Sequence, residues 1–162
     1  MLDRMPGKLL CGPILLLAAC SGETPQESQP GADARPYRIT TDIQQTMKWI
    51  LEPAADVIWD SAGTIITAQG RQELAPTTAA GWATVRYAAA TLAESGNLLM
   101  LPGRSMGADW NEYSQGLVAA GKLAMDAVEA RDPDALFDAG GRIYQVCRAC
   151  HNQYWVKGEE DD

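Results

Sequence analysis

Two cysteines and a histidine near the carboxyl end of the chain have the spacing of a chemical site. The segment reads Cys147-Arg148-Ala149-Cys150-His151, and the chain has no other histidine. Residues three and four apart on a helix share a face, so both thiols and the imidazole can approach one bound group. The pattern is typical of covalent haem attachment, in which the sulfurs bind the porphyrin and the imidazole binds the iron. The sequence therefore predicts one haem c per chain.

Two other chemistries use a Cys-x-x-Cys pair. A redox-active disulfide usually opens a helix that follows a strand, where the helix dipole lowers a thiol pKa. Cys147 and Cys150 instead fall late in a predicted helix, and no strand-helix-strand pattern precedes them. Zinc would need a fourth ligand beyond these three residues. In addition, Cys147, Cys150 and His151 lie too close together in sequence for a typical structural zinc site. Haem is the preferred interpretation, and both alternatives stay open.

Four helices are predicted to position this motif. Helical periodicity places them at about 41–68, from after residue 76 to about 100, at about 109–130 and from 133 to about 157. Asp132 is a suitable N-cap and Pro133 suits the first position of the last helix. Short connections predict an all-α, up-and-down antiparallel four-helix bundle. Its Ala- and Gly-rich helices indicate either close backbone approaches or room for a bulky cofactor.

The first predicted helix contains a proline. Ile58 and Ile65 recur at helical spacing, and Gly70 is a plausible terminator. Pro53 has no N–H to donate to the carbonyl of Trp49, so we expect a kink at this point.

The amino-terminal residues have the features of an export signal. Arg4 and Lys8 precede a short apolar run over 9–19, which is too short to span a bilayer comfortably. The end of this run, Leu17-Ala18-Ala19-Cys20, resembles the lipobox of bacterial lipoproteins, whose cysteine is lipidated and becomes the first residue. An ordinary signal peptide with an incidental cysteine is the alternative. We expect a signal peptide over 1–19 and a lipid anchor on Cys20.

Composition also divides the rest of the chain into regions and limits the kinds of partner. Residues 20–40 read as the lipidated cysteine and a flexible Gly-, Pro- and Ser-containing tether, 41–157 as the haem-binding bundle and 158–162 as an acidic tail. Once Cys11 leaves with the signal and Cys20 is lipidated, only the motif cysteines remain, so no disulfide framework is expected. The net charge of −8 disfavours a nucleic-acid partner.

The sequence resembles the cytochrome c′ family, including its low-spin relatives. The likeness is strongest from Ala135 to Tyr154, because that family carries its CxxCH motif at the end of the last helix, whereas ordinary cytochromes c carry it near the start. Weaker likeness is found at 97–103, 109–110 and 43–47. The resemblance covers about 41–157 and implies a cytochrome c′-like bundle in which Cys147 and Cys150 hold the haem and His151 is an axial ligand.

The resemblance also implies a residue on the other side of the iron. The segment Ile43-Gln44-Gln45-Thr46-Met47 resembles the family's distal motif, usually Arg-Gln-x-x-Met or Leu. Met47 is therefore a second axial ligand or an apolar cap, although a Met on a core stripe can equally be packing. The arginine of the motif is Ile43 here, so no propionate contact is implied at that position. Met100, Met106 and Met125 are reserve candidates for the distal ligand.

These features lead to a functional expectation. We expect a periplasm-facing, membrane-anchored c-type cytochrome that transfers electrons, because Met ligation suits transfer and raises the potential. The alternative is a five-coordinate haem protein that binds nitric oxide or carbon monoxide. The sequence contains no catalytic constellation, so no enzyme is expected. Expected partners are redox proteins, the membrane through Cys20 and, as the family allows, a second copy; Ser21 after that cysteine favours the outer membrane.

Overall fold

The structure is a computed structural model that describes residues 36–155, and the fold below is that of 39–155. Its elements in chain order are α1 (Ile43–Thr46), η1 (Met47–Leu51), α2 (Glu52–Trp59), β1 (Thr64–Thr67), β2 (Gly70–Glu73), α3 (Ala79–Leu99), α4 (Ala108–Ala130) and α5 (Pro133–Tyr154). The predicted signal peptide, Cys20, most of the tether and the acidic tail lie outside the described residues. None of the helices within 36–155 is long and apolar enough to cross a membrane.

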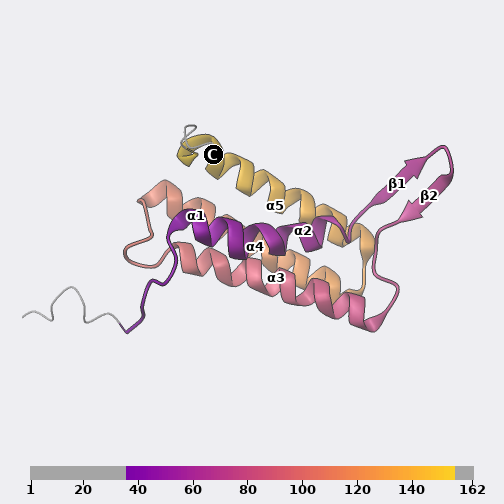
Figure 1. Cartoon of the computed structure of the whole chain (residues 1–162), viewed down its shortest axis with the longest axis horizontal. Coiled ribbons are helices and arrows are strands. Elements are labelled where there is room, and N and C mark those ends of the chain that lie inside the picture. The colour runs from indigo at the N-terminus through magenta and orange to yellow at the C-terminus, as the bar shows by residue number, and fades with distance from the viewer. Residues whose placement is uncertain (1–35, 156–162) are drawn as a thin grey trace, which may run out of the picture. The chain divides into compact units, whose positions relative to one another are not determined.

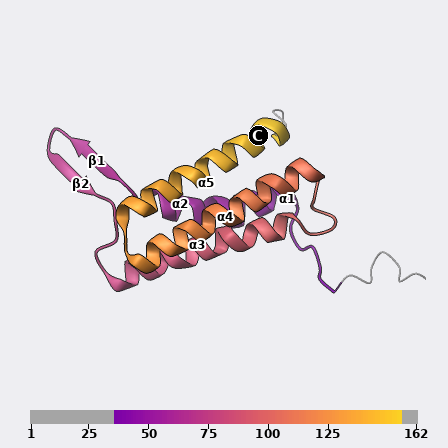
Figure 2. The ribbon, with the colours of Figure 1, turned by 180° about the vertical axis from the view of Figure 1, so that it is seen from behind.

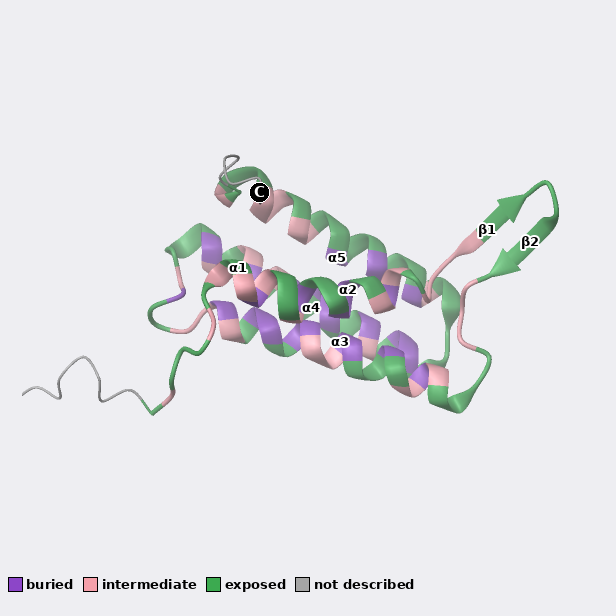
Figure 3. Cartoon of the chain, viewed as in Figure 1, coloured by how far each residue is buried: buried purple, intermediate pink, exposed green. Residues whose placement is uncertain are grey.

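Four helical segments run alternately up and down (Figures 1 and 2). Elements α1, η1 and α2 are continuous and form the first segment, and α3, α4 and α5 are the others. α3 packs on α2 and α4, and α5 packs on α4 and α2, so each segment touches two neighbours. Buried residues line the inner faces of the segments (Figure 3). The prediction of a mainly helical chain with four antiparallel segments is confirmed.

The first segment contains a wider turn directly before Pro53. Asp42 caps its start: the side chain accepts from the N–H of Gln45, and the Gln45 side chain accepts from the N–H of Asp42. Further along, the N–H of Glu52 donates to the carbonyl of Met47, five residues back, which makes η1 a π-helical turn. This turn keeps the segment helical up to a proline that cannot donate a hydrogen bond.

The prediction that the first helix reaches Ala68 is wrong. α2 ends at Trp59, and an antiparallel hairpin follows in which Ile65 pairs with Gln72. Ile65 mimics helical spacing because it lies seven residues after Ile58, but it belongs to a β-branched run that favours a strand. Gly70 does not terminate a helix; it opens β2 with a φ of +135°, a backbone conformation that glycine adopts without strain.

α3 and α4 approach each other at backbone distance. A Cβ at Gly121 would lie 2.7 Å from the amide nitrogen of Ala93, and a Cβ at Gly96 would lie 2.6 Å from the carbonyl oxygen of Ser114. Neither neighbour is a flexible side chain that could move aside. These glycines therefore set the spacing of the two helices.

Replacing Gly121 by Ala should destabilise the protein. The added methyl must push the helices apart, which costs about 1–3 kcal/mol and outweighs a helix-propensity gain of about 1 kcal/mol. Gly141→Ala is the matched control, because a Cβ at this exposed helical position meets no atom within 4 Å. Thermal unfolding followed by circular dichroism should show a lower midpoint for Gly121→Ala and a higher one for Gly141→Ala. An equal gain in both variants would contradict the close approach.

The hairpin should weaken in acid. Hydrogen bonds from Arg71 and Thr64 lower the pKa of Glu73 below its ordinary value of 4.5. A carboxyl group whose pKa is lowered by folding stabilises the folded state at any pH above its ordinary pKa. This stabilisation is lost as the pH falls through the lower pKa of the folded state. NMR chemical shifts of Ile65 and Gln72 should therefore move towards coil values below about pH 4.5, while the buried α4 residues Leu117 and Ala120 keep folded-state values. Glu73→Gln should abolish this transition, and its persistence in that variant would assign it elsewhere.

Candidate haem-binding site

The CxxCH motif occupies the last turns of α5, where the helix has left the core. The buried residues of α5 are Leu136, Ala139, Gly140 and Ile143. From 144 to 155 no residue is fully buried, and Cys147, Cys150 and His151 are each half-buried. The inner stripe of α5 therefore has a first half covered by protein and a second half that is only partly covered.

One flank of this stripe faces the first helical segment. The indole N–H of Trp59 donates to the carbonyl of Gly140 over 3.0 Å. A Cβ at Gly140 would also lie 3.3 Å from the Trp59 ring, so the two helices touch here. Cys147 and His151 lie seven and eleven residues after Gly140. Since these spacings return to the same flank of a helix, the motif faces the segment formed by α1 and η1.

The opposite flank is fixed to the start of α4. Gln153 accepts a hydrogen bond from the Tyr113 hydroxyl over 3.1 Å and donates one to the Asp109 carboxylate over 3.0 Å. The rings of Trp110 and Tyr154 meet edge to face with centroids 5.1 Å apart. These contacts hold the end of α5 just beyond the motif. These contacts could not be predicted from the sequence, because no spacing within one helix indicates a contact between two helices.

Met47 lies on the flank of the first segment that faces α5. Thr46 is 0 % exposed and takes the core position that precedes Leu51, whereas Met47 is half-buried. Met47 follows Thr46 as Trp59 follows Ile58, and Trp59 is the residue that contacts α5. Equal steps around a helix thus turn Met47 towards the side on which α5 lies.

Met47 and His151 also lie at about the same level along the bundle. His151 is eleven residues beyond Gly140, and Met47 is twelve residues before Trp59, with one extra residue taken up by the π-helical turn. At about 1.5 Å per residue, each is roughly 16 Å from the Trp59–Gly140 contact. Antiparallel helices that start from one contact and rise equally bring these two residues to the same level along the bundle axis.

The residues at this level fit a haem. Ile43, Met47, Val146, Cys147 and Cys150 pack against the core but are only partly buried. A flat apolar group between the two helices would bury them further, which is favourable at about 25 cal/mol per Å². The sulfurs and the imidazole supply the attachment atoms that the motif predicts. The residues present therefore fit a haem in their chemistry.

The protonation states of the motif suit ligation rather than thiol redox chemistry. Burial lowers the pKa of His151, which favours the neutral imidazole that binds metals. Burial raises the pKa of the Cys147 thiol, and burial together with the neighbouring Cys147 raises that of Cys150. Disulfide catalysts need a lowered thiol pKa, so this alternative loses support. Within 36–155, no cluster of three or more His, Cys, Asp or Glu side chains could hold a metal ion alone, as a zinc site would require.

The reserve methionines are less well placed than Met47. Met106 is exposed in the α3–α4 connection, and Met100 is the C-cap of α3. Met125 packs against the core on α4. It lies nine residues beyond Gly116, whose Cβ would contact Val146 of α5, so it is displaced along α4 away from the level of His151.

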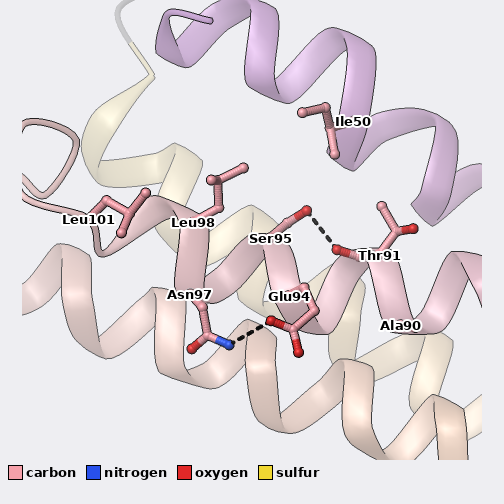
Figure 4. A pocket seen from close by; sticks show the side chains of 8 residues that line it. All are labelled: Ile50, Ala90, Thr91, Glu94, Ser95, Asn97, Leu98 and Leu101. Carbon is pink, nitrogen blue, oxygen red and sulfur yellow. Dashed lines mark hydrogen bonds between the residues drawn. The ribbon is translucent and has the colours of Figure 1, made fainter. Parts of the chain in front are cut away.

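A shallow, open pocket of about 640 Å³ lies elsewhere, between η1 and α3 (Figure 4). Its lining residues are Ile50, Ala90, Thr91, Glu94, Ser95, Asn97, Leu98 and Leu101. None of these residues belongs to α5. The pocket is therefore separate from the candidate haem site, and Ile50 marks the flank of the first segment that faces α3.

Comparisons with protein-family models, with curated proteins and with solved structures found no match to this chain.

Proposed function

We propose that the protein is a c-type cytochrome with one haem attached covalently through Cys147 and Cys150. The observation that carries this proposal is the half-buried stripe of α5: the CxxCH motif lies on it, at about the level of Met47 along the bundle. A haem between these helices would cover apolar side chains that the protein itself leaves partly exposed.

The chain's own groups have distinct roles in this proposal. His151 would bind the iron, and burial lowers the pKa of the imidazole, which favours the neutral form that binds metals. Met47 would supply a thioether ligand or an apolar cap. The α4 contacts to Gln153 and Tyr154 hold the end of α5 in place. A bound haem supplies one-electron redox chemistry, and we propose electron transfer as the function.

The proposal also covers the fold family, the cellular location and the partners of the protein. The bundle is cytochrome c′-like, and the protein is a periplasmic lipoprotein anchored through Cys20, with the outer membrane as the favoured site. Its partners are redox proteins, and a second copy of the chain is a further partner. Nitric oxide or carbon monoxide binding is the competing function, and it would require Met47 to cap the haem without binding the iron.

Covalent attachment is tested by mass. Protein purified from a haem-maturing bacterial host should be heavier than its processed chain by one haem, and the haem should stay bound after denaturation. Cys147→Ala/Cys150→Ala should lose this mass, because no thioether can form. Cys20→Ala is the matched control: it removes the proposed lipid site, and should keep the haem. Pigment that separates from the denatured wild-type chain, or a chain that never holds any, would refute the proposal.

The role of Met47 is tested by the spin state. If its thioether binds the iron, the wild-type protein should be low-spin, and Met47→Ala should become high-spin with a lower reduction potential, since Met ligation raises it. Met125→Ala is the control, because it removes a half-buried methionine that lies on α4, away from the level of His151. It should leave the spin state unchanged. A high-spin wild-type spectrum that Met47→Ala leaves unchanged would instead favour gas binding.

A further inference from the structure

Arg104 is a buried arginine whose hydrogen-bonding capacity is only partly used. It lies in the connection between α3 and α4 and is 6 % exposed. Its Nη2 donates to the carbonyl oxygen of Thr41 over 3.1 Å and to the Thr41 hydroxyl over 2.9 Å. Its Nε and Nη1 are buried and have no partner among the described residues. A guanidinium carries five N–H donors, and a buried cation with open donors is costly unless a negative group meets it.

A hydrogen-bonded network holds Arg104 at the start of the first helical segment. The hydroxyls of Thr41 and Thr46 are 2.8 Å apart, and the Thr46 hydroxyl donates to the carbonyl of Asp42 over 2.6 Å. Thr46 is fully buried and directly precedes Met47. The guanidinium is therefore anchored to the turn that positions the proposed distal residue.

The place of Arg104 in the bundle agrees with the haem site. The α3–α4 connection, the start of α1 and the end of α5 lie at the same end of the bundle in both ribbon views (Figures 1 and 2). The CxxCH motif lies in the final turns of α5, and Ile43, the first residue of α1, is about 6 Å along the axis from Met47. The guanidinium thus reaches the end of the bundle at which a haem between α5 and the first segment would lie.

A haem carries its negative charge on two propionate carboxylates, at the edge opposite the groups that the cysteines bind. Guanidinium and carboxylate pair through charge-assisted hydrogen bonds, which are about twice as strong as neutral ones. We propose that the unpaired Nε–H and Nη1–H groups of Arg104 bind a propionate of the haem, for which the side chains that cover them must move aside. This inference rests on the proposed haem function, and it assigns a binding residue that no motif indicates.

The test is the pH dependence of the propionate in the full-length, haem-loaded protein. With Arg104 in place, the propionate pKa should lie below the ordinary carboxyl value of about 4.3. Arg104→Gln removes the cation, so the propionate pKa should rise by at least one pH unit, or about tenfold in proton affinity. The reduction potential, which falls as the propionate ionises, should then fall over a correspondingly higher pH range. Arg104→Lys keeps a charge and should shift the pKa less.

Arg86→Gln is the matched control, because Arg86 is exposed on α3. It should leave the propionate unchanged. Infrared redox-difference spectra of protein with ¹³C-labelled propionates assign the titrating group. Such an assignment is needed because this end of the bundle also carries Asp42, Lys48, Asp109, Glu112, Arg148, His151 and Tyr154.

The outcomes separate this inference from the haem proposal. Absence of covalent haem in the wild-type protein refutes the proposed function. Covalent haem with the same propionate titration in wild type and Arg104→Gln refutes the role of Arg104 alone. If both Arg104 variants fail to fold, the wild-type titration decides: a labelled propionate that ionises at or above the ordinary carboxyl value overturns the inference, and one that ionises clearly below it supports it.

Discussion

The inner stripe of α5 packs on α4, and α2 of the first helical segment covers only the first half of this stripe. At the Trp59–Gly140 contact the Trp59 side chain lies against the backbone of α5. Beyond Ile143 the same stripe continues with Val146 and Cys147, which are half-buried. A helix that keeps its apolar periodicity beyond the point where protein covers it is suited to a second apolar partner. The motif on this part of the helix supplies the atoms that would attach one.

The spacing of the other helices is consistent with a group on this side of the bundle. α3 and α4 are held at backbone distance by Gly96 and Gly121, because any side chain there would collide with a neighbouring main chain. The Gly-rich interior thus corresponds to close packing at the α3–α4 interface, and not to room for a cofactor there. Backbone contacts fix α3 against α4, whereas α5 is held near its end by the longer side chains Gln153 and Tyr154. The bundle is therefore tightly packed between α3 and α4, whereas side chains separate the end of α5 from α4.

Local signals predicted much of this fold, and contacts between segments explain what they missed. The start of α5 follows from Asp132 and Pro133, since a cap and a first-turn proline act within a few residues. The hairpin was missed because Ile65 repeats the spacing of a helix by chance. The CxxCH motif can be recognised in the sequence because covalent haem attachment requires a fixed spacing of its residues. The role of Arg104 cannot be predicted from the sequence, because its burial and its contact with Thr41 bring together residues 63 positions apart.

Pro53 has a consequence that reaches beyond its own turn. A proline inside a helix leaves one carbonyl without its partner, and the chain accommodates this with the five-residue step from Glu52 to Met47. In a regular α-helix the residue four before Leu51 shares its face, and that residue is Met47. The extra residue instead gives this buried position to Thr46, whose hydroxyl is satisfied by the carbonyl of Asp42. Met47 is thereby moved from a fully buried position to a half-buried one at the edge of the core. A substitution that restored a regular helix here would place Met47 at the buried position that Thr46 now occupies, so Pro53 helps to set the exposure of the proposed distal residue.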